Sequence, residues 1–179
     1  CPPPEDSVLN DTGILDCANY TENLLDCPVI DWPGQDAEYG RDVTQYDDSD
    51  GHAGFSFTKL DGNGNPLPAN TPSWTCVKDN VTNLIWEVKT RDGGLQDRAN
   101  TYTWYNPDSK INGGDAGTQN GGICTVDDCD TQGYVQSVNT QGLCGANDWR
   151  MPTNKELENI ASLGRYTPAI DTDYFPNTQ

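Results

Sequence analysis

The chain is poor in basic and imidazole side chains, with one histidine, His52, and 10 Lys and Arg residues among 179. A Ser-His-Asp or Cys-His catalytic site would have to use His52. This residue lies in an Asp-rich turn, where a solvated or hydrogen-bonded histidine is the simpler interpretation. The sequence also lacks a histidine pair, a Cys-x-x-Cys pair and the glycine motifs that bind phosphates or dinucleotides. These absences argue against zinc and lead us to expect that the protein is not an enzyme.

Basic residues are also too few for a nucleic-acid partner. The 28 Asp and Glu residues give a formal net charge of −18, whereas phosphate contacts need Lys and Arg. No apolar run approaches the roughly 18 residues of a membrane-spanning helix. Such an acidic composition is typical of a solvated surface or of a surface that binds cations.

Cysteine and aromatic residues, in contrast, are plentiful. The seven Cys, five Trp and eight Tyr residues argue against disorder, and the cysteines indicate an extracellular or bacterial cell-surface location. The 18 Gly and 12 Pro residues favour loops over long regular elements. Cys1 is followed by Pro2, Pro3 and Pro4, which suits a lipid anchor and suits a terminal disulfide equally well.

An irregular Cys- and Pro-rich arm is predicted over residues 1–40, followed by an α+β domain over residues 41–179. Alternating, β-branched or aromatic stretches predict a small antiparallel sheet in this domain. The predicted extended segments are 54–60, two segments around Asp79-Asn80 of which the second is 84–88, and 101–105.

Two short helices follow. The first is predicted over residues 131–140, with Asp130 or Thr131 as its cap and Gly142 after its end. The second begins at Thr153, where Thr153 and Glu156 form a capping box. The predicted buried stripe and end of the second helix are Leu157, Ile160, Ala161 and Gly164.

Six of the cysteines are predicted to form structural disulfides. Cys17 and Cys27 end the related tetrapeptides ILDC and LLDC and would close a small loop. The other four are Cys76, Cys124, Cys129 and Cys144, where one of the last three pairs with its neighbour and another with Cys76. Cys1 is then left for a lipid, an intermolecular bond or a partner outside this sequence.

Calcium is the cofactor that the acidic turns suggest. Oxygen-bearing side chains at alternate positions let a turn wrap a hard cation. For each turn, an acidic loop without metal is the simpler alternative. The candidate ligands are Asp61, Asn63 and Asn65 in one turn, Asp47, Asp48 and Asp50 in a second, and Asp127, Asp128 and Asp130 in a third.

A polar loop over residues 106–122, beside Trp104, is the predicted recognition surface. Loops of this length inside a compact domain are uncommon and tend to be functional, and an exposed indole face can stack on a sugar ring. Trp86 and Trp149 are predicted to belong to the core, whereas Trp32 and Trp74 stay undecided. The candidate ligand-binding residues are Trp104, Tyr105, Asn106, Asp108, Asn112 and Asp115.

Five segments, taken together and in order, resemble the bacterial domain named after the C-terminal part of the Legionella collagen-like adhesin. They are WTCVKDNVTNLIWEVKT, TYTWYNP, CDTQGYVQSVN, GLCGANDWRMPTNKELENI and PAIDTDYFPNT. The resemblance implies a C-type-lectin-like, formylglycine-generating-enzyme-like fold in secreted or surface proteins, with binding of sulfated glycans as a candidate role. It also implies closing strands after the YFPNT segment, which this sequence does not include.

Within the GLCGANDWRMPTNKELENI segment, Met151 replaces the leucine that is usual in the family. The residues themselves have simple structural interpretations: Trp149 fills the core, and Arg150 forms a buried ion pair with an Asp or Glu.

The expected function is therefore an extracellular, non-enzymatic adhesion module for a glycan or another cell-surface polymer, with calcium shaping its loops. The alternative is a structural subunit of an extracellular fibre or surface assembly that exchanges arms or strands between copies. Analogy at the level of the fold also suggests a copper-dependent cysteine oxidase. The expected pair of active cysteines would lie in the part that this sequence does not include.

Overall fold

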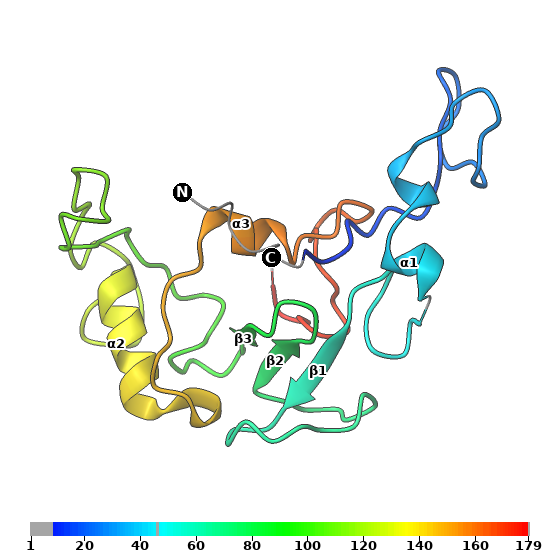
Figure 1. Ribbon diagram of the computed structural model, residues 1–179. Helices are drawn as coiled ribbons and strands as arrows, with labels where there is room; N and C mark the ends of the chain where they lie inside the picture. The colour runs from blue at the N-terminus through cyan, green and yellow to red at the C-terminus, as the bar shows by residue number, and fades with distance from the viewer. Residues whose placement is uncertain (1–8, 46, 179) are drawn as a thin grey trace.

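A three-stranded sheet and a few short helices form the protein. The computed structural model describes residues 9–45 and 47–178. The elements in chain order are η1 (Asp36–Glu38), α1 (Arg41–Thr44), β1 (Phe57–Leu60), β2 (Cys76–Asp79), β3 (Ile85–Glu87), α2 (Thr131–Gln141), η2 (Leu143–Gly145) and α3 (Asn154–Glu158). The predicted α+β class with short helices and a small antiparallel sheet is confirmed. Figure 1 shows the sheet between α2 on one side and the arm that precedes α1 on the other.

The sheet has the order β1-β2-β3, with both neighbouring pairs antiparallel. β1 is shorter than the strand predicted over residues 54–60. The chain turns just before it, where the Phe55 amide donates a hydrogen bond to the His52 carbonyl oxygen. Residues 101–105 are extended, but alternate residues bridge three different segments. These isolated bridges are Thr101 with Ile123, Thr103 with Asp130, and Tyr105 with Gly117.

Asp79 is fully buried and organises the turn between β2 and β3. Its Oδ1 accepts hydrogen bonds from the amides of Val81 and Thr82, and its Oδ2 accepts one from the Thr82 hydroxyl at 2.6 Å. Oδ2 also accepts one from Asn10 Nδ2 at 2.6 Å. These donors replace the water that the carboxylate loses on burial, and the bond to Asn10 joins the N-terminal segment to the sheet.

Apolar side chains form a separate cluster on each face of the sheet. Because side chains alternate along a strand, Phe57 and Leu60 enter different clusters. The first cluster contains Phe55, Phe57, Val77, Val88, Ile160, Ile170, Tyr174 and Phe175, with Trp74 and Trp86 against it. The second contains Leu60, Cys76, Val138, Leu143 and Cys144, with Leu95, Tyr134 and Trp149 against it. The predicted core positions of Trp86 and Trp149 are therefore confirmed, with both rings partly buried.

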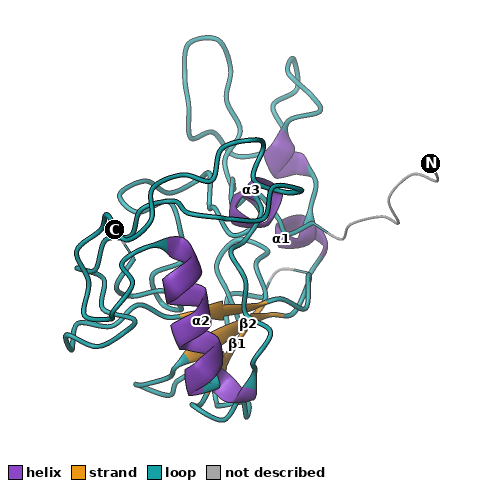
Figure 2. Cartoon of the chain, turned by 90° about the vertical axis from the view of Figure 1, so that its left-hand side faces the viewer, coloured by secondary structure: helices purple, strands orange, loops and turns teal. Residues whose placement is uncertain are grey.

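The helix α2 begins and ends where local signals place it. The Asp130 carboxylate accepts a hydrogen bond from the Gly133 amide at 2.8 Å, and Gly142 follows the last turn with a left-handed φ of 66°. Glycine is favoured there because a Cβ makes this conformation costly. Figure 2 shows α2 crossing in front of the sheet.

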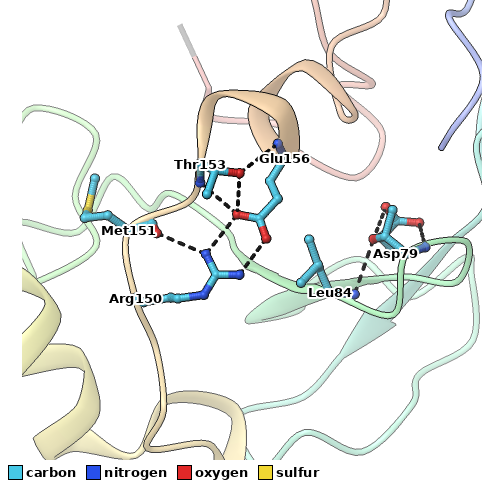
Figure 3. Close-up of polar contacts among 7 residues, drawn as sticks. Asp79, Leu84, Arg150, Met151, Thr153 and Glu156 are labelled. Atoms are coloured by element: carbon cyan, nitrogen blue, oxygen red, sulfur yellow. Dashed lines mark hydrogen bonds and ion pairs between the residues drawn. The ribbon is translucent and has the colours of Figure 1, made fainter. Parts of the chain in front are cut away.

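The helix α3 has the predicted capping box but is shorter than predicted. Figure 3 shows Glu156 receiving hydrogen bonds from both Thr153 and Arg150. Arg150 does form an ion pair, but its side chain is 58% exposed, so the prediction of a buried pair is wrong. These hydrogen bonds lower the pKa of Glu156 to about 2, with the bond from Arg150 as the largest cause. Leu157 is 48% exposed rather than buried.

The early end of α3 has a tertiary cause. The Ser162 amide donates to the Ala169 carbonyl oxygen, and the Leu163 amide donates to that of Thr12. Backbone amides that pair with distant segments cannot continue a helix. The helix therefore ends at Glu158, six residues before the predicted end at Gly164.

Three disulfides support this fold, in agreement with the predicted pairing scheme. They join Cys17 to Cys27, Cys76 to Cys144, and Cys124 to Cys129. The predicted lipid anchor or terminal disulfide at Cys1 lies outside the described residues. None of the described helices is long and apolar enough to cross a membrane.

The arm projects from the rest of the protein between residues 14 and 35, in the blue part of Figure 1. Cys17 and Leu25 exchange two backbone hydrogen bonds of 2.8 Å beside the Cys17–Cys27 disulfide, which closes this projecting loop. Just before the loop, the Asp11 carboxylate accepts a hydrogen bond from the Arg41 amide at 2.6 Å. The boundary predicted at residue 40 stays a prediction.

Candidate functional site

A cleft of about 700 Å³ opens beside β1. It is lined by residues 48, 49, 51 and 52, by Lys59, by residues 69–72 and Trp74, and by Arg165 and residues 171–174. A smaller cavity of about 320 Å³ adjoins it, since Arg165 and Thr172 line both. The lining combines aromatic rings with cationic, anionic, hydroxyl and amide groups, which is the composition expected of a site for a polar ligand.

Lys59 projects from β1 and is only 7% exposed. Its Nζ lies 3.6 Å from the centre of the Trp74 ring and 5.3 Å from that of Tyr174, so the ammonium makes cation–π contacts with both. It donates one hydrogen bond, to the Thr71 carbonyl oxygen at 3.3 Å. Burial lowers the pKa of Lys59, although the carboxylates of Asp173 and Asp171 act in the opposite direction.

In the described part of the chain, no carboxylate oxygen comes within 4.0 Å of Lys59 Nζ. An ammonium carries three donors, and only one has a partner here. Lys59 is therefore a buried cation with unused hydrogen-bonding capacity at the wall of a cavity.

Asp171 holds two walls of the cleft together. Its Oδ2 accepts a hydrogen bond from the His52 amide at 2.9 Å, and its Oδ1 accepts one from the Asp173 amide at 3.0 Å. Arg165 Nη1 lies 3.7 Å from the same Oδ1. Asp171 is 3% exposed, so these contacts replace the hydrogen bonds with water that the carboxylate loses on burial.

Tyr174 and Trp74 fix the aromatic wall. Trp74 Nε1 donates to the Tyr174 carbonyl oxygen at 3.0 Å, and the Tyr174 hydroxyl donates to the Ser49 carbonyl oxygen at 3.4 Å. Burial is the main cause that raises the pKa of Tyr174 to about 12, with Asp50 the next cause. The phenol therefore stays protonated at neutral pH.

His52 is a turn residue, as predicted, and it also lines the cleft. Its Nδ1 lies 3.9 Å from Asp48 Oδ1. Sequence reasoning did not identify Lys59 or Trp74 as site residues. One signal was available, because Lys59 follows Phe55 and Phe57 at alternate positions of an extended segment and so falls on its buried side.

The loop over residues 106–122 has a different organisation. Its polar side chains accept hydrogen bonds from amides two residues further on, which are Asx-type turns. The pairs are Asn106 with Asp108, Asp108 with Lys110, Asn112 with Gly114, and Asp115 with Gly117. Trp104 is 51% exposed, and the Tyr105 amide bonds to the Thr131 hydroxyl. None of the six predicted ligand-binding residues lines the cleft around Lys59, and their role stays a prediction.

The candidate calcium ligands also bond within their own turns. Asp61 Oδ1 accepts hydrogen bonds from the amides of Asn63 and Asn65 at 2.8 Å, and bonds from Asn65 are the main causes that lower the pKa of Asp61. Over residues 9–45 and 47–178, no group of three or more His, Cys, Asp or Glu side chains is placed to hold a metal ion.

The other two acidic turns divide their side chains among different partners. Asp47 accepts a hydrogen bond from the Ser49 amide, Asp48 from the Ala53 amide and Asp50 from the Ser56 hydroxyl. In the third turn Asp130 caps α2, whereas Asp127 and Asp128 are exposed. Calcium binding in these turns stays a prediction.

Residues 75–179 match the family model described as the Lcl C-terminal domain. This match begins just before β2 and includes α2, α3 and the wall of the cleft formed by Arg165 and residues 171–174. Lys59 and Trp74 precede it. No curated protein and no solved structure matches the chain. Because the matched segment is more than half of the sequence, the chain belongs to the Lcl C-terminal domain family.

Proposed function

We propose that this protein is an extracellular, non-enzymatic binding module and that the cleft around Lys59 binds a glycan. The observation that carries the proposal is the wall formed by Trp74 and Tyr174 beside both hydrogen-bond donors and acceptors. Sugars present apolar ring faces and many hydroxyl groups, so they need aromatic contact and both kinds of polar partner. The three disulfides favour an extracellular location because they persist in oxidising compartments.

The two adjoining cavities favour a chain of sugars over a single small ligand. Arg165 and Thr172 lie where the cavities meet, and the exposed Tyr166 ring lines the smaller one. A ligand that spans both cavities could therefore contact an aromatic residue in each.

The charges at the cleft also support a glycan. Lys59 and Arg165 lie with Asp48, Asp171 and Asp173 around the larger cavity. The lining is thus nearly balanced in a chain whose formal net charge is −18. A sugar that carries an acidic group therefore meets less repulsion there than it would at the acidic surface elsewhere.

A glycan array followed by calorimetry on the strongest ligand tests the proposal. Asn70 and Thr172 are exposed residues of the cleft, so N70A/T172A is expected to keep the fold while losing two hydrogen-bonding groups. We expect this variant to bind about tenfold more weakly, at about 0.5–1.5 kcal/mol for each lost bond. Trp104→Ala is the matched control in the polar loop and should bind like the parent. Absence of binding to any glycan, or loss of binding only in Trp104→Ala, contradicts the proposal.

Calcium is the proposed cofactor of the acidic turns, supported by the grouping of Asp61, Asn63 and Asn65 around one turn. Thermal unfolding with calcium and with a chelator tests this. A higher midpoint in calcium that Asp61→Asn removes supports the proposal, and an unchanged midpoint contradicts it.

The projecting arm favours a second candidate function, a subunit of an extracellular assembly. Its exposed apolar side chains are Tyr20, Leu24, Ile30 and Trp32, of which Ile30 is 91% exposed. Apolar side chains grouped on a projecting loop are typical of contact surfaces. Sedimentation velocity over a range of concentrations tests this candidate. We expect L24S/I30S to lower the assembled fraction and Ile111→Ser, an exposed apolar residue of the polar loop, to leave it unchanged. A monomer at every concentration contradicts it.

A further inference from the structure

We propose that Lys59 forms a subsite for a single negative charge, and that the glycan bound in the cleft carries a carboxylate there, as a uronic acid does. The inference rests on the proposed function and names the ligand class of the same cleft. Lys59 and Trp74 lie outside residues 75–179, the segment that matches the family model.

The position of the Lys59 ammonium is the first argument. The residue is 7% exposed and lies against the Trp74 ring, and within residues 9–45 and 47–178 its one hydrogen-bond partner is the Thr71 carbonyl oxygen. A buried charge is stable when it is paired and hydrogen-bonded, and two of the three ammonium donors have no partner among these described residues. An acidic group in the cavity would accept those donors and pair the charge.

The second argument is that the carboxylate oxygens of Asp171 already have other partners. This carboxylate could have paired with Lys59, but it accepts the amides of His52 and Asp173 and lies beside Arg165 instead. The Asp171 carboxylate thus links the segments that form the walls of the cleft. Its charge still acts on Lys59 through space, but its oxygens do not satisfy the ammonium.

The acidic neighbours set a limit on the charge of the ligand. Asp171 and Asp173 both act on Lys59, and Asp173 is exposed at the rim of the cleft. A ligand with two negative charges would meet repulsion from both carboxylates, whereas a single charge is balanced by the ammonium. The cleft therefore favours a carboxylate over a phosphate ester.

Matched pairs of sugars test the subsite. The probes are methyl glucuronide against methyl glucoside, and methyl galacturonide against methyl galactoside, with a sugar 6-phosphate as the dianionic comparison. Binding is followed through the NMR signals of the Lys59 side chain. We expect each uronide to bind at least about tenfold more tightly than its neutral partner, as expected when a charge-assisted bond replaces a neutral one, and the phosphate to bind more weakly than the uronide.

Four variants test whether Lys59 causes the preference for uronides. Lys59→Met keeps the length of the side chain against Trp74 but removes the charge, so it should abolish the preference for uronides. Asp173→Asn should increase that preference, because it removes a repulsive carboxylate. Lys155→Met, an exposed lysine on α3, is the matched control and should change nothing. Lys59→Arg, which restores a cation, should recover part of the preference, because the charge of the side chain and not its packing sets the preference.

The outcomes separate the subsite from the proposed function. Equal binding of uronides and neutral sugars overturns the subsite and leaves glycan binding intact. If no sugar binds, the proposed function fails, and acetate then decides the subsite. A saturable shift of the Lys59 signals on adding acetate supports an anion subsite, and unchanged signals overturn it.

Discussion

The polar loop over residues 106–122 and the cleft around Lys59 contain similar residue types but use them in opposite ways. In the loop, Asn106, Asp108 and Asn112 accept hydrogen bonds from amides two residues away. In the cleft, the groups that converge come from four separated segments. The polar side chains of the loop thus use their hydrogen-bonding capacity within their own turns. Side chains brought together by the fold keep part of their capacity for a ligand.

Removal of a disulfide should give the largest difference in the free energy of unfolding between a long-range link and a local one. Cys76–Cys144 spans 68 residues and joins β2 to η2, whereas Cys124–Cys129 spans 5 residues after the polar loop. The loss of loop-closure entropy in the unfolded chain predicts that C76A/C144A costs about 4 kcal/mol and C124A/C129A about 2 kcal/mol. Urea unfolding measures both. Equal losses would mean that the short disulfide supports more than its own loop.

Replacing one carboxylate in each region sharpens the comparison further. Asp171→Ala leaves the partly buried amides of His52 and Asp173 without this acceptor, and we expect a loss of about 2–3 kcal/mol. Asp108→Ala removes one exposed turn contact and should cost less than about 1 kcal/mol. Both values come from urea unfolding. If Asp108→Ala lowers the free energy of unfolding as much as Asp171→Ala does, the contrast between the loop and the cleft is wrong.

The ion pair of Glu156 lies in neither region and should have the smallest effect on the free energy of unfolding. It therefore serves as a reference for the variants of the loop and the cleft. Its folded pKa of about 2 lies below the ordinary 4.5, so the ionised form stabilises the fold above pH 4.5. That contribution is lost as the pH falls from 4.5 towards 2. Because Arg150 is 58% exposed, solvent screens the pair, and we expect about 1 kcal/mol or less.

Glu156→Gln, which keeps a hydrogen-bonding side chain, is the variant for this measurement. The free energy of unfolding of the parent should exceed that of the variant at pH 6, and the difference should shrink at pH 3. A difference that is constant across this range would contradict the assigned role of the charge.

Local signals account for the parts of the fold that the sequence predicts well. Asp130 and Gly142 set the ends of α2, and Thr153 with Glu156 sets the start of α3, because each acts over a few residues. The predicted end of α3 is wrong because the amides of Ser162 and Leu163 bond to backbone groups of other segments.

The cleft could not be predicted from local patterns. Trp74 bonds to a residue 100 positions away, and Lys59 gains its role from that pairing. The exposed Trp104 was recognised from its polar surroundings. Such surroundings indicate exposure and do not reveal which segments meet.

The bond from Trp74 to the carbonyl group of Tyr174 also has a consequence for how the protein is made. During synthesis, all three strands leave the ribosome long before Tyr174 does. Contacts between segments far apart in sequence close a large loop and so form slowly. The sheet can pair early, but the ammonium of Lys59 stays solvated until the segment around Tyr174 has been made. Folding intermediates should therefore contain the β2–β3 turn and lack the cleft around Lys59.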